Sequence, residues 1–117
     1  MSPSQHRKHR GYTSQRIVAK YLAEHGFPYA EPAGAGRPGT DVTGVVGIDI
    51  EVKARRGFPV SEALRQLAQR YKQGNVSVAV LRMDGQGPTT VDQWPAIITL
   101  GALVELLREA GYGEPRP

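Results

Sequence analysis

The sequence predicts a single α/β (α+β) domain in which helices flank a central mixed β-sheet, with the element order αβββαβ(β)α. Three patterns predict this fold class: helical spacing of apolar residues near both ends, strict apolar–charged alternation over 48–55, and a mostly apolar run over 76–81. Such an order of elements packs helices against one mixed sheet. The 117 residues suit one domain that is large enough to bury its own core.

The N-terminal half is expected to form a helix followed by strands. Apolar residues at helical spacing give the segment 13–25 one apolar face, and Gly26 provides its C-terminal stop. The segment 32–40 is rich in glycine and proline, which predicts a loop. The strands expected around this loop are 27–30, about 41–44, and 48–55.

The C-terminal half is expected to alternate helices and strands. Ser61 is a suitable N-cap for a helix over 62–72, which carries an apolar stripe. The apolar run 76–81 is typical of a central strand. The remaining expected elements are a turn at 84–88, a strand within 90–99, and a helix at 100–110 that Gly111 follows.

The ends of the chain are expected to lie outside the packed domain, which spans 12–111. Residues 1–11 are polar and basic, which is typical of a flexible arm; the end of a helix is the alternative. Residues 112–117 form a tail that is expected to fray. The chain has no apolar run long enough to cross a bilayer and no signal-peptide pattern, so a soluble, cytoplasmic protein is expected.

Charge is distributed unevenly along the chain. The net charge is +4, yet residues 1–82 hold thirteen Lys/Arg against six Asp/Glu, and residues 83–117 hold two against five. A one-sided basic field attracts a polyanion such as DNA, although a protein that is basic by chance shows the same totals. The absence of cysteine excludes disulfides, thiolate metal sites and cysteine nucleophiles, and it fits a reducing compartment.

The alternating strand expected at 48–55 presents a charged face. Successive side chains on a strand point to opposite faces, so the apolar residues face the core and the charged residues share the other side. Glu51 and Lys53 are therefore neighbours, roughly 6.5–7 Å apart along the strand. A solvated face held by salt bridges, which contribute little stability, is the alternative interpretation. The charged set is Asp49, Glu51, Lys53 and Arg55.

Asp41 is expected to join this charged face from the preceding strand. If residues 45–47 form a three-residue hairpin loop with Gly47 in the left-handed conformation, Asp41 lies opposite Glu51, about 5 Å away. Two carboxylates at that distance need a cation between them, and Mg²⁺ prefers such hard oxygen ligands. A two-residue turn at Val46-Gly47 would instead slip the register by one residue and turn Asp41 away.

These residues resemble a known nuclease signature. Gly39-Thr40-Asp41, followed after nine residues by Glu51-Val52-Lys53, resembles the PD-(D/E)XK motif. The run 34–41 resembles the glycine-rich approach to the catalytic aspartate in archaeal and phage Holliday-junction resolvases of that superfamily. The resemblance covers roughly residues 10–82. It implies a restriction-endonuclease-like core and a magnesium-dependent endodeoxyribonuclease, a homodimer that acts on branched, four-way DNA.

The resemblance also implies roles for individual residues. Asp41 and Glu51 would bind Mg²⁺ or Mn²⁺. Lys53 would orient the attacking water and stabilise the charge that develops on phosphorus. The backbone carbonyl of Val52 faces along the sheet edge and is a further candidate oxygen ligand for the metal.

Two glutamines are candidate supporting residues. Gln15 stands where the family often has a metal-supporting glutamate near the start of the first helix. Because Gln15 brings no charge, a single metal ion is favoured. Gln66 resembles a polar residue that related nucleases direct at the active site, and an exposed helix glutamine is the alternative.

Several basic residues are candidate DNA contacts. Arg37 lies beside Asp41 and is able to grip a phosphate bidentately, and Arg55 and Arg56 continue the charged strand. Two other functions stay open: a nicking, repair or restriction-like nuclease on other DNA structures, and a DNA-binding module with a decayed active site, which Gln15 invites. The full set of candidate contacts is Arg7, Lys8, Arg10, Arg16, Arg37, Arg55 and Arg56.

Overall fold

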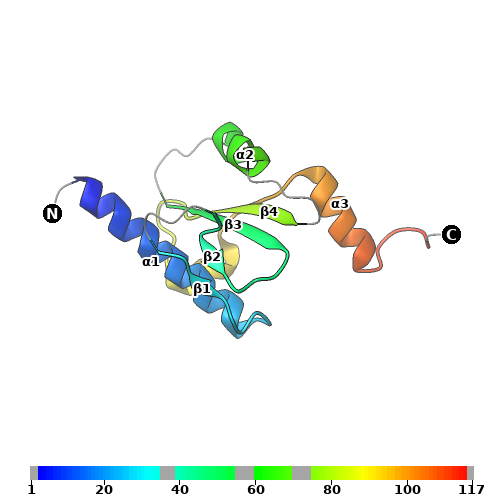
Figure 1. Cartoon of the computed structure of the whole chain (residues 1–117), viewed down its shortest axis with the longest axis horizontal. Helices are drawn as coiled ribbons and strands as arrows, with labels where there is room; N and C mark the ends of the chain where they lie inside the picture. The colour runs from blue at the N-terminus through cyan, green and yellow to red at the C-terminus, as the bar shows by residue number, and fades with distance from the viewer. Residues whose placement is uncertain (1–2, 35–38, 55–59, 70–74, 116–117) are drawn as a thin grey trace.

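The computed structural model describes residues 3–34, 39–54, 60–69 and 75–115, with side chains from Arg10 onward. Its helices lie on both sides of a small sheet (Figure 1). This arrangement confirms the predicted α+β class with a mixed sheet. In chain order the elements are α1 (Pro3–Glu24), β1 (Glu31–Pro32), β2 (Val42–Thr43), β3 (Ile48–Lys53), α2 (Val60–Gln69), β4 (Val76–Leu81), the 3₁₀ helix η1 (Pro88–Gln93), β5 (Ala96–Ile97) and α3 (Leu100–Glu109).

The central sheet has the strand order β3-β4-β5. Strands β3 and β4 run parallel, in register from Ile48↔Val76 to Lys53↔Leu81, and β5 pairs antiparallel with β4. Strands β1 and β2 form a separate antiparallel pair. Because β3 and β4 are parallel, their carboxyl ends lie side by side at one end of the sheet. The candidate site lies at this end of β3.

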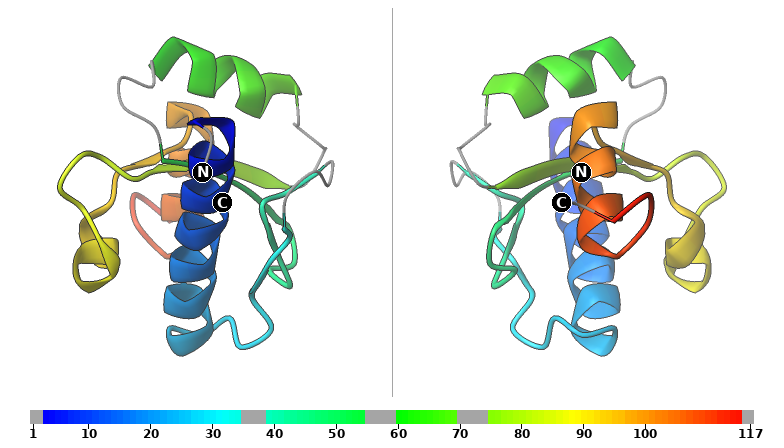
Figure 2. Two further views of the ribbon diagram at one scale, coloured as in Figure 1. Left: turned by 90° about the vertical axis from the view of Figure 1, so that its left-hand side faces the viewer. Right: turned by 90° about the vertical axis from the view of Figure 1, so that its right-hand side faces the viewer.

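The core has one cluster on each face of the sheet. Helix α1 covers one face and α2 the other (Figure 2). The smaller cluster joins Ala63 and Leu67 of α2 to Ala79 of β4. The larger cluster consists of Val18, Ala19, Ala30, Val42, Val45, Ile50, Val52 and Trp94.

The alternation predicted for β3 is confirmed. Ile50 and Val52 are 3% and 6% exposed and belong to the cluster under α1. Glu51 is the register partner of Ala79, which packs against α2. The apolar and the charged residues of β3 therefore face opposite helices. The strand ends at Lys53 and is shorter than the expected 48–55, because Ala54 is not part of it; Arg55 lies outside the described residues.

The N-terminal elements differ from the expected ones in two places. Helix α1 begins at Pro3, so the helical alternative applies to most of the basic segment 1–11. Proline is well suited to the first turn of a helix, where its missing N–H is not needed. The strand expected at 27–30 is wrong, because these residues form a turn in which the Ala30 N–H donates to the Phe27 carbonyl (3.0 Å). The strand β1 follows this turn.

The C-terminal elements follow the prediction more closely. The region 90–99 holds a 3₁₀ helix as well as the expected strand, which is limited to Ala96–Ile97. Helix α3 is capped by the Thr99 side chain, which accepts from the Ala102 N–H (3.2 Å). Among the helices that the structure describes, none is both long and apolar enough to cross a membrane.

Candidate functional site

Asp41 is held against the edge of β3 that faces away from β4. Its N–H donates to the Ile50 carbonyl (2.7 Å), and its Oδ2 accepts from the Val52 N–H (2.8 Å). The Thr40 hydroxyl oxygen accepts from the Ile50 N–H (2.8 Å) and so fixes the approach to Asp41. The Val52 nitrogen belongs to the peptide that follows Glu51, so the Asp41 carboxylate lies beside the Glu51-Val52-Lys53 segment.

The Val52 carbonyl emerges at the same edge as the Asp41 carboxylate. In a strand, the N–H and the C=O of one residue point to the same side, and the Val52 N–H points to Asp41. The next residue faces the other way, since the Lys53 carbonyl accepts from the Arg82 N–H beyond β4 (2.7 Å). The backbone therefore supplies a further oxygen next to Asp41, as expected from the sequence.

Glu51 and Lys53 form an ion pair on the α2 side of the sheet. Their Oε2 and Nζ atoms are 3.7 Å apart, and the side chains are 13% and 26% exposed. The alternative of a fully solvated charged face does not describe Glu51, which is mostly buried. Charges that are partly shielded from water interact more strongly than charges on an open surface.

The hairpin geometry expected before β3 is wrong. A two-residue turn replaces the three-residue loop at 45–47, because the Ile48 N–H donates to the Val45 carbonyl (3.3 Å). This turn slips the register, but β2 then leaves β3 and pairs with β1. Because β2 pairs with β1 rather than with β3, the one-residue shift in register does not turn Asp41 away. Asp41 still hydrogen-bonds to the edge of β3.

Gly44 permits this path of the chain, in which β2 pairs with β1. Its φ of +81° lies in the left-handed region, and a Cβ at this position would overlap the backbone carbonyl of Tyr29. Gly47 has the same φ of +81°, which agrees with the left-handed conformation expected for it. Both glycines are therefore required by backbone geometry near the site.

Gln15 on α1 and Gln66 on α2 each bury an amide oxygen that has no hydrogen-bond partner within the described part of the chain. A buried acceptor without a donor costs about 1–3 kcal/mol, so such atoms call for an ion, a water or a ligand. Gln15 follows Ser14, whose hydroxyl contacts Arg82 at the end of β4. Gln15 thus lies on α1 next to the residue that contacts the end of β4.

The residues at this edge fit a divalent cation that prefers oxygen. In the described residues, no group of three or more Asp, Glu, His or Cys side chains converges. The Asp41 carboxylate and the Val52 carbonyl lie at this edge, Glu51 projects from the same segment of β3 toward α2, and Gln15 carries a further amide oxygen on α1. All four are hard oxygen ligands, which suit Mg²⁺ or Mn²⁺ rather than a softer metal.

The predicted DNA contacts are described only in part. Arg16 is exposed on α1, and Arg10 lies 3.9 Å from Asp84 in an exposed ion pair. Arg7 and Lys8 lie on the first turns of α1, which project beyond the sheet (Figure 1). Arg37, Arg55 and Arg56 lie outside the described residues.

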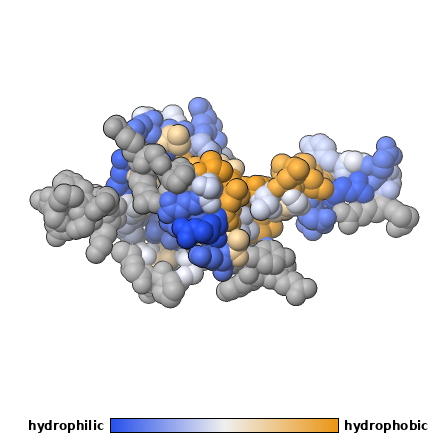
Figure 3. All heavy atoms as spheres, turned by 90° about the horizontal axis from the view of Figure 1, so that it is seen from above, coloured by the Kyte–Doolittle hydropathy of each residue, from blue (hydrophilic) through white to orange (hydrophobic). Residues whose placement is uncertain are grey.

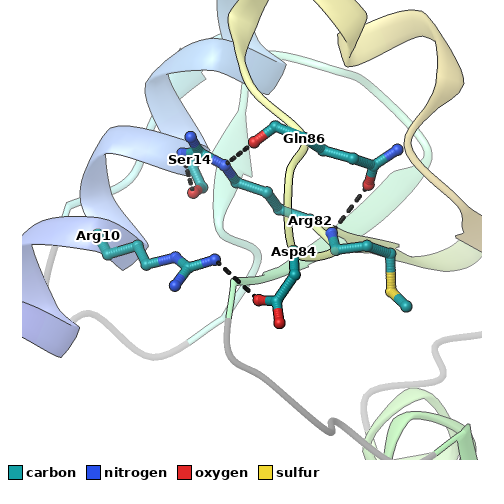
Figure 4. Close-up of polar contacts among 6 residues, drawn as sticks. Arg10, Ser14, Arg82, Asp84 and Gln86 are labelled. Carbon is teal, nitrogen blue, oxygen red and sulfur yellow. Dashed lines mark hydrogen bonds and ion pairs between the residues drawn. The ribbon is translucent and has the colours of Figure 1, made fainter.

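Arg82 is a residue that the sequence analysis missed. Its Nε donates to the Gln86 carbonyl (2.9 Å), its Nη1 donates to the buried hydroxyl of Ser14 (3.2 Å), and its guanidinium lies 5.4 Å from the Trp94 ring centre. Figure 4 shows Ser14 and Gln86 on either side of Arg82. Arg82 directly follows the apolar strand β4, and this position is visible in the sequence. It ties α1 to the end of β4.

Comparison of the chain with models of protein families, with curated proteins and with solved structures found no match. The geometry of the site is therefore what bears on function. That geometry brings a carboxylate and a backbone carbonyl to one edge of β3, beside a partly buried glutamate–lysine pair. Such a set suits a divalent cation together with a phosphate group.

Proposed function

We propose that this protein is a metal-dependent DNA endonuclease that hydrolyses phosphodiester bonds, with Asp41, Glu51 and Lys53 in its active site. The observation that carries the proposal is the hydrogen bond from the Val52 N–H to the Asp41 carboxylate (2.8 Å). It brings the aspartate beside the strand segment that bears Glu51 and Lys53, as the PD-(D/E)XK resemblance requires.

Asp41 and Glu51 would hold Mg²⁺ or Mn²⁺, with the Val52 carbonyl and the Gln15 amide as further oxygen donors. When bound, such an ion polarises the phosphodiester and offsets charge in the transition state. The protein holds the donors in place through the Asp41 hydrogen bonds to Ile50 and Val52. This arrangement prepares the site before substrate arrives.

Lys53 would orient the attacking water and stabilise the charge on phosphorus. Glu51, 3.7 Å from the Lys53 Nζ, keeps the ammonium group directed along the strand. Gln66 buries an amide oxygen on the helix that covers this face, and it would accept a hydrogen bond from that water. These groups act by position and charge.

The basic residues near the site support DNA as the substrate. Lys53 lies at the end of β3, and the exposed residues Arg10 and Arg16 lie on α1. Phosphate contacts of this kind give affinity without sequence preference. Branched, four-way DNA is the proposed substrate, and the resemblance to resolvases is its only support. Nicking of flaps or duplexes is the alternative within the same chemistry.

Cleavage of labelled DNA in the presence of Mg²⁺ tests the proposal. Four-way junction, flap, linear duplex and single strand are compared, and the junction is expected to be cut fastest. Asp41→Asn and Lys53→Ala are each expected to slow cleavage about a hundredfold or more. Glu24→Gln, an exposed carboxylate at the end of α1, is the matched control. Full activity in the Asp41 and Lys53 variants would remove the mechanism.

A DNA-binding module without catalysis is the second candidate, and Gln15 favours it because it supplies no charge where a carboxylate is expected. Calorimetry with Mn²⁺ separates the two candidates. A nuclease site takes up the ion, and Glu51→Gln abolishes the uptake. A pure binder shows no uptake in either protein. Salt dependence of DNA binding does not discriminate, because both candidates bind phosphate.

A further inference from the structure

An apolar cavity lies on the α1 side of the sheet, toward the amino ends of β3 and β4. Helix α1 and the 3₁₀ helix η1 both lie on this face and contact each other (Figure 2). Between them, Ile48 of β3 and Val78 of β4 line the cavity and are only partly buried. The volume of the cavity is about 290 Å³. Because protein interiors are close-packed, with few voids larger than a water molecule, a space of this size points to an occupant.

The wall of the cavity belongs in part to the larger core cluster. Val18 of α1, Ile50 of β3 and Trp94 line it, and they are 4%, 3% and 5% exposed. Hydrophobic side chains also reach the surface on the α2 side, over the middle of the molecule and over α3 (Figure 3). The leucines of α3 are each 39% or more exposed. A ligand in the cavity would therefore lose far more of its contact with water than a ligand on α3.

The lining indicates the chemistry of the occupant. An apolar cavity offers water too few polar partners, and an engineered cavity of about 150 Å³ stays dry and binds benzene. The Trp94 Nε1 is already used, since it donates to the Gly87 carbonyl (3.2 Å). Asp92 is the one charged residue among the described residues that line the cavity. Its side chain is exposed and has no ion-pair partner within the described part of the chain.

We propose that this cavity binds a small organic cation, in which a compact ring or branched alkyl group carries one amine. The apolar group would fill the space between Leu22, Val78 and Trp94, which all line the cavity. The ammonium group would remain at the solvent-exposed rim beside the carboxylate of Asp92. Charge complementarity at the rim favours a cation over a neutral or anionic ligand of the same shape.

This binding site is separate from the proposed nuclease site. The cavity begins at Ile48, whereas Lys53 lies at the other end of β3, roughly 16 Å away at the usual rise of a strand. Glu51 points to the α2 side of the sheet, and the cavity lies on the α1 side. The inference therefore goes beyond the proposed function, and its test needs neither DNA nor metal.

Trp94 provides the test, because it is the single tryptophan of the chain and lines the cavity. The full chain is titrated with three probes that share a benzyl-sized ring and differ in charge: benzylamine, benzyl alcohol and benzoate. Benzylamine is expected to change the Trp94 fluorescence saturably at millimolar concentration and to raise the melting temperature. Benzyl alcohol should bind about three- to fivefold more weakly, the effect of one exposed ion pair, and benzoate more weakly still.

Asp92→Asn tests the role of the carboxylate. This variant should bind benzylamine about three- to fivefold more weakly and should bind benzyl alcohol as the wild type does. Glu109→Gln is the matched control, because it removes an exposed carboxylate from α3 and should leave the binding of all three probes unchanged. Equal affinity for the three probes, or an equal effect of the two substitutions, overturns the proposal.

Two further variants test whether the probe occupies the cavity. Val78→Phe places a larger side chain inside it and should abolish the saturable response to benzylamine. Ala96→Leu adds volume at an exposed position of the rim, where the core is not disturbed, and it covers the case in which Val78→Phe does not fold. Circular dichroism checks the fold of both variants. A linear quench without saturation in the wild type, or an unchanged response in Ala96→Leu, would also overturn the proposal.

Discussion

The Oδ2 atom of Asp41 accepts a hydrogen bond of 2.8 Å from the peptide N–H of Val52. This contact ties the loop before β2 to the edge of β3 and orients the carboxylate beside Glu51. Asp41 thus has a structural task as well as the metal-binding task proposed for it. The two tasks depend on different properties of the side chain, since any oxygen acceptor serves the first and a negative charge serves the second.

Two substitutions at Asp41 should separate these tasks. Asparagine keeps an oxygen that can accept from Val52, so Asp41→Asn should lower the free energy of unfolding by less than 1 kcal/mol while reducing cleavage strongly. Asp41→Ala leaves the Val52 N–H without its partner and should cost about 1–3 kcal/mol. Urea denaturation of both variants measures the difference. Equal stabilities would argue against the Asp41–Val52 hydrogen bond.

Metal ions should stabilise the folded wild type. An ion that binds the native state at a hundred times its dissociation constant adds about 2.7 kcal/mol to the free energy of unfolding. Addition of Mn²⁺ should therefore raise the melting temperature of the wild type but not that of Glu51→Gln. NaCl at the same ionic strength serves as the control for nonspecific screening. An equal rise in both proteins would place the ion elsewhere.

Gln15→Glu should strengthen metal binding. The new carboxylate would add a charge where the wild type has an orphaned amide oxygen, and an affinity gain of about tenfold is expected from the magnitude of such changes. Without metal, the added negative charge should lower stability through repulsion with Asp41 and Glu51. Calorimetry measures the affinity, and Gln93→Glu, at an exposed position, is the control. Unchanged affinity would place Gln15 away from the ion.

Arg82 should contribute to stability through its planar guanidinium rather than through its charge. Arg82→Lys keeps the charge but cannot reproduce the contacts with Ser14, Gln86 and Trp94, and it should cost about 1–2 kcal/mol. Ser14→Ala should cost about 1 kcal/mol. A double-mutant cycle tests the pair, because the combined loss should be smaller than the sum. Strict additivity would contradict the Arg82–Ser14 contact.

Two glycine substitutions should change the stability of the fold in opposite directions. Gly44→Ala forces a side chain into a left-handed conformation and against the Tyr29 carbonyl, so it should lower stability by more than 1 kcal/mol. Gly11 lies inside α1 with open space where a Cβ would stand, so Gly11→Ala should raise stability by about 0.5–1 kcal/mol. Thermal melting of both variants checks the signs.

The sequence predicted the elements whose side chains follow a clear period. Alternation over β3 correctly assigned Ile50 and Val52 to the core and Glu51 to the other face. The apolar run of β4 was also placed correctly. The first turns of α1 show no apolar period, since they are polar and basic, so helix and flexible arm could not be separated from the sequence.

The geometry at Asp41 depends on tertiary contacts that no local pattern reports. The residues at 45–47 allow a two-residue or a three-residue turn, and the pairing of β2 with β1 determines where Asp41 lies after that turn. Arg82 was missed for the same reason. Its partner Ser14 lies 68 residues earlier, in a helix whose polar residues have no distinctive spacing.

The burial of Ser14 and Val18 has a consequence for synthesis of the chain. Both lie on α1, whereas Arg82 and Trp94, which contact or pack with them, are translated later; Arg82 follows Ser14 by 68 residues. The apolar stripe of α1 therefore stays exposed until residues 82–94 have been made. During that interval the nascent chain is a natural client for chaperones.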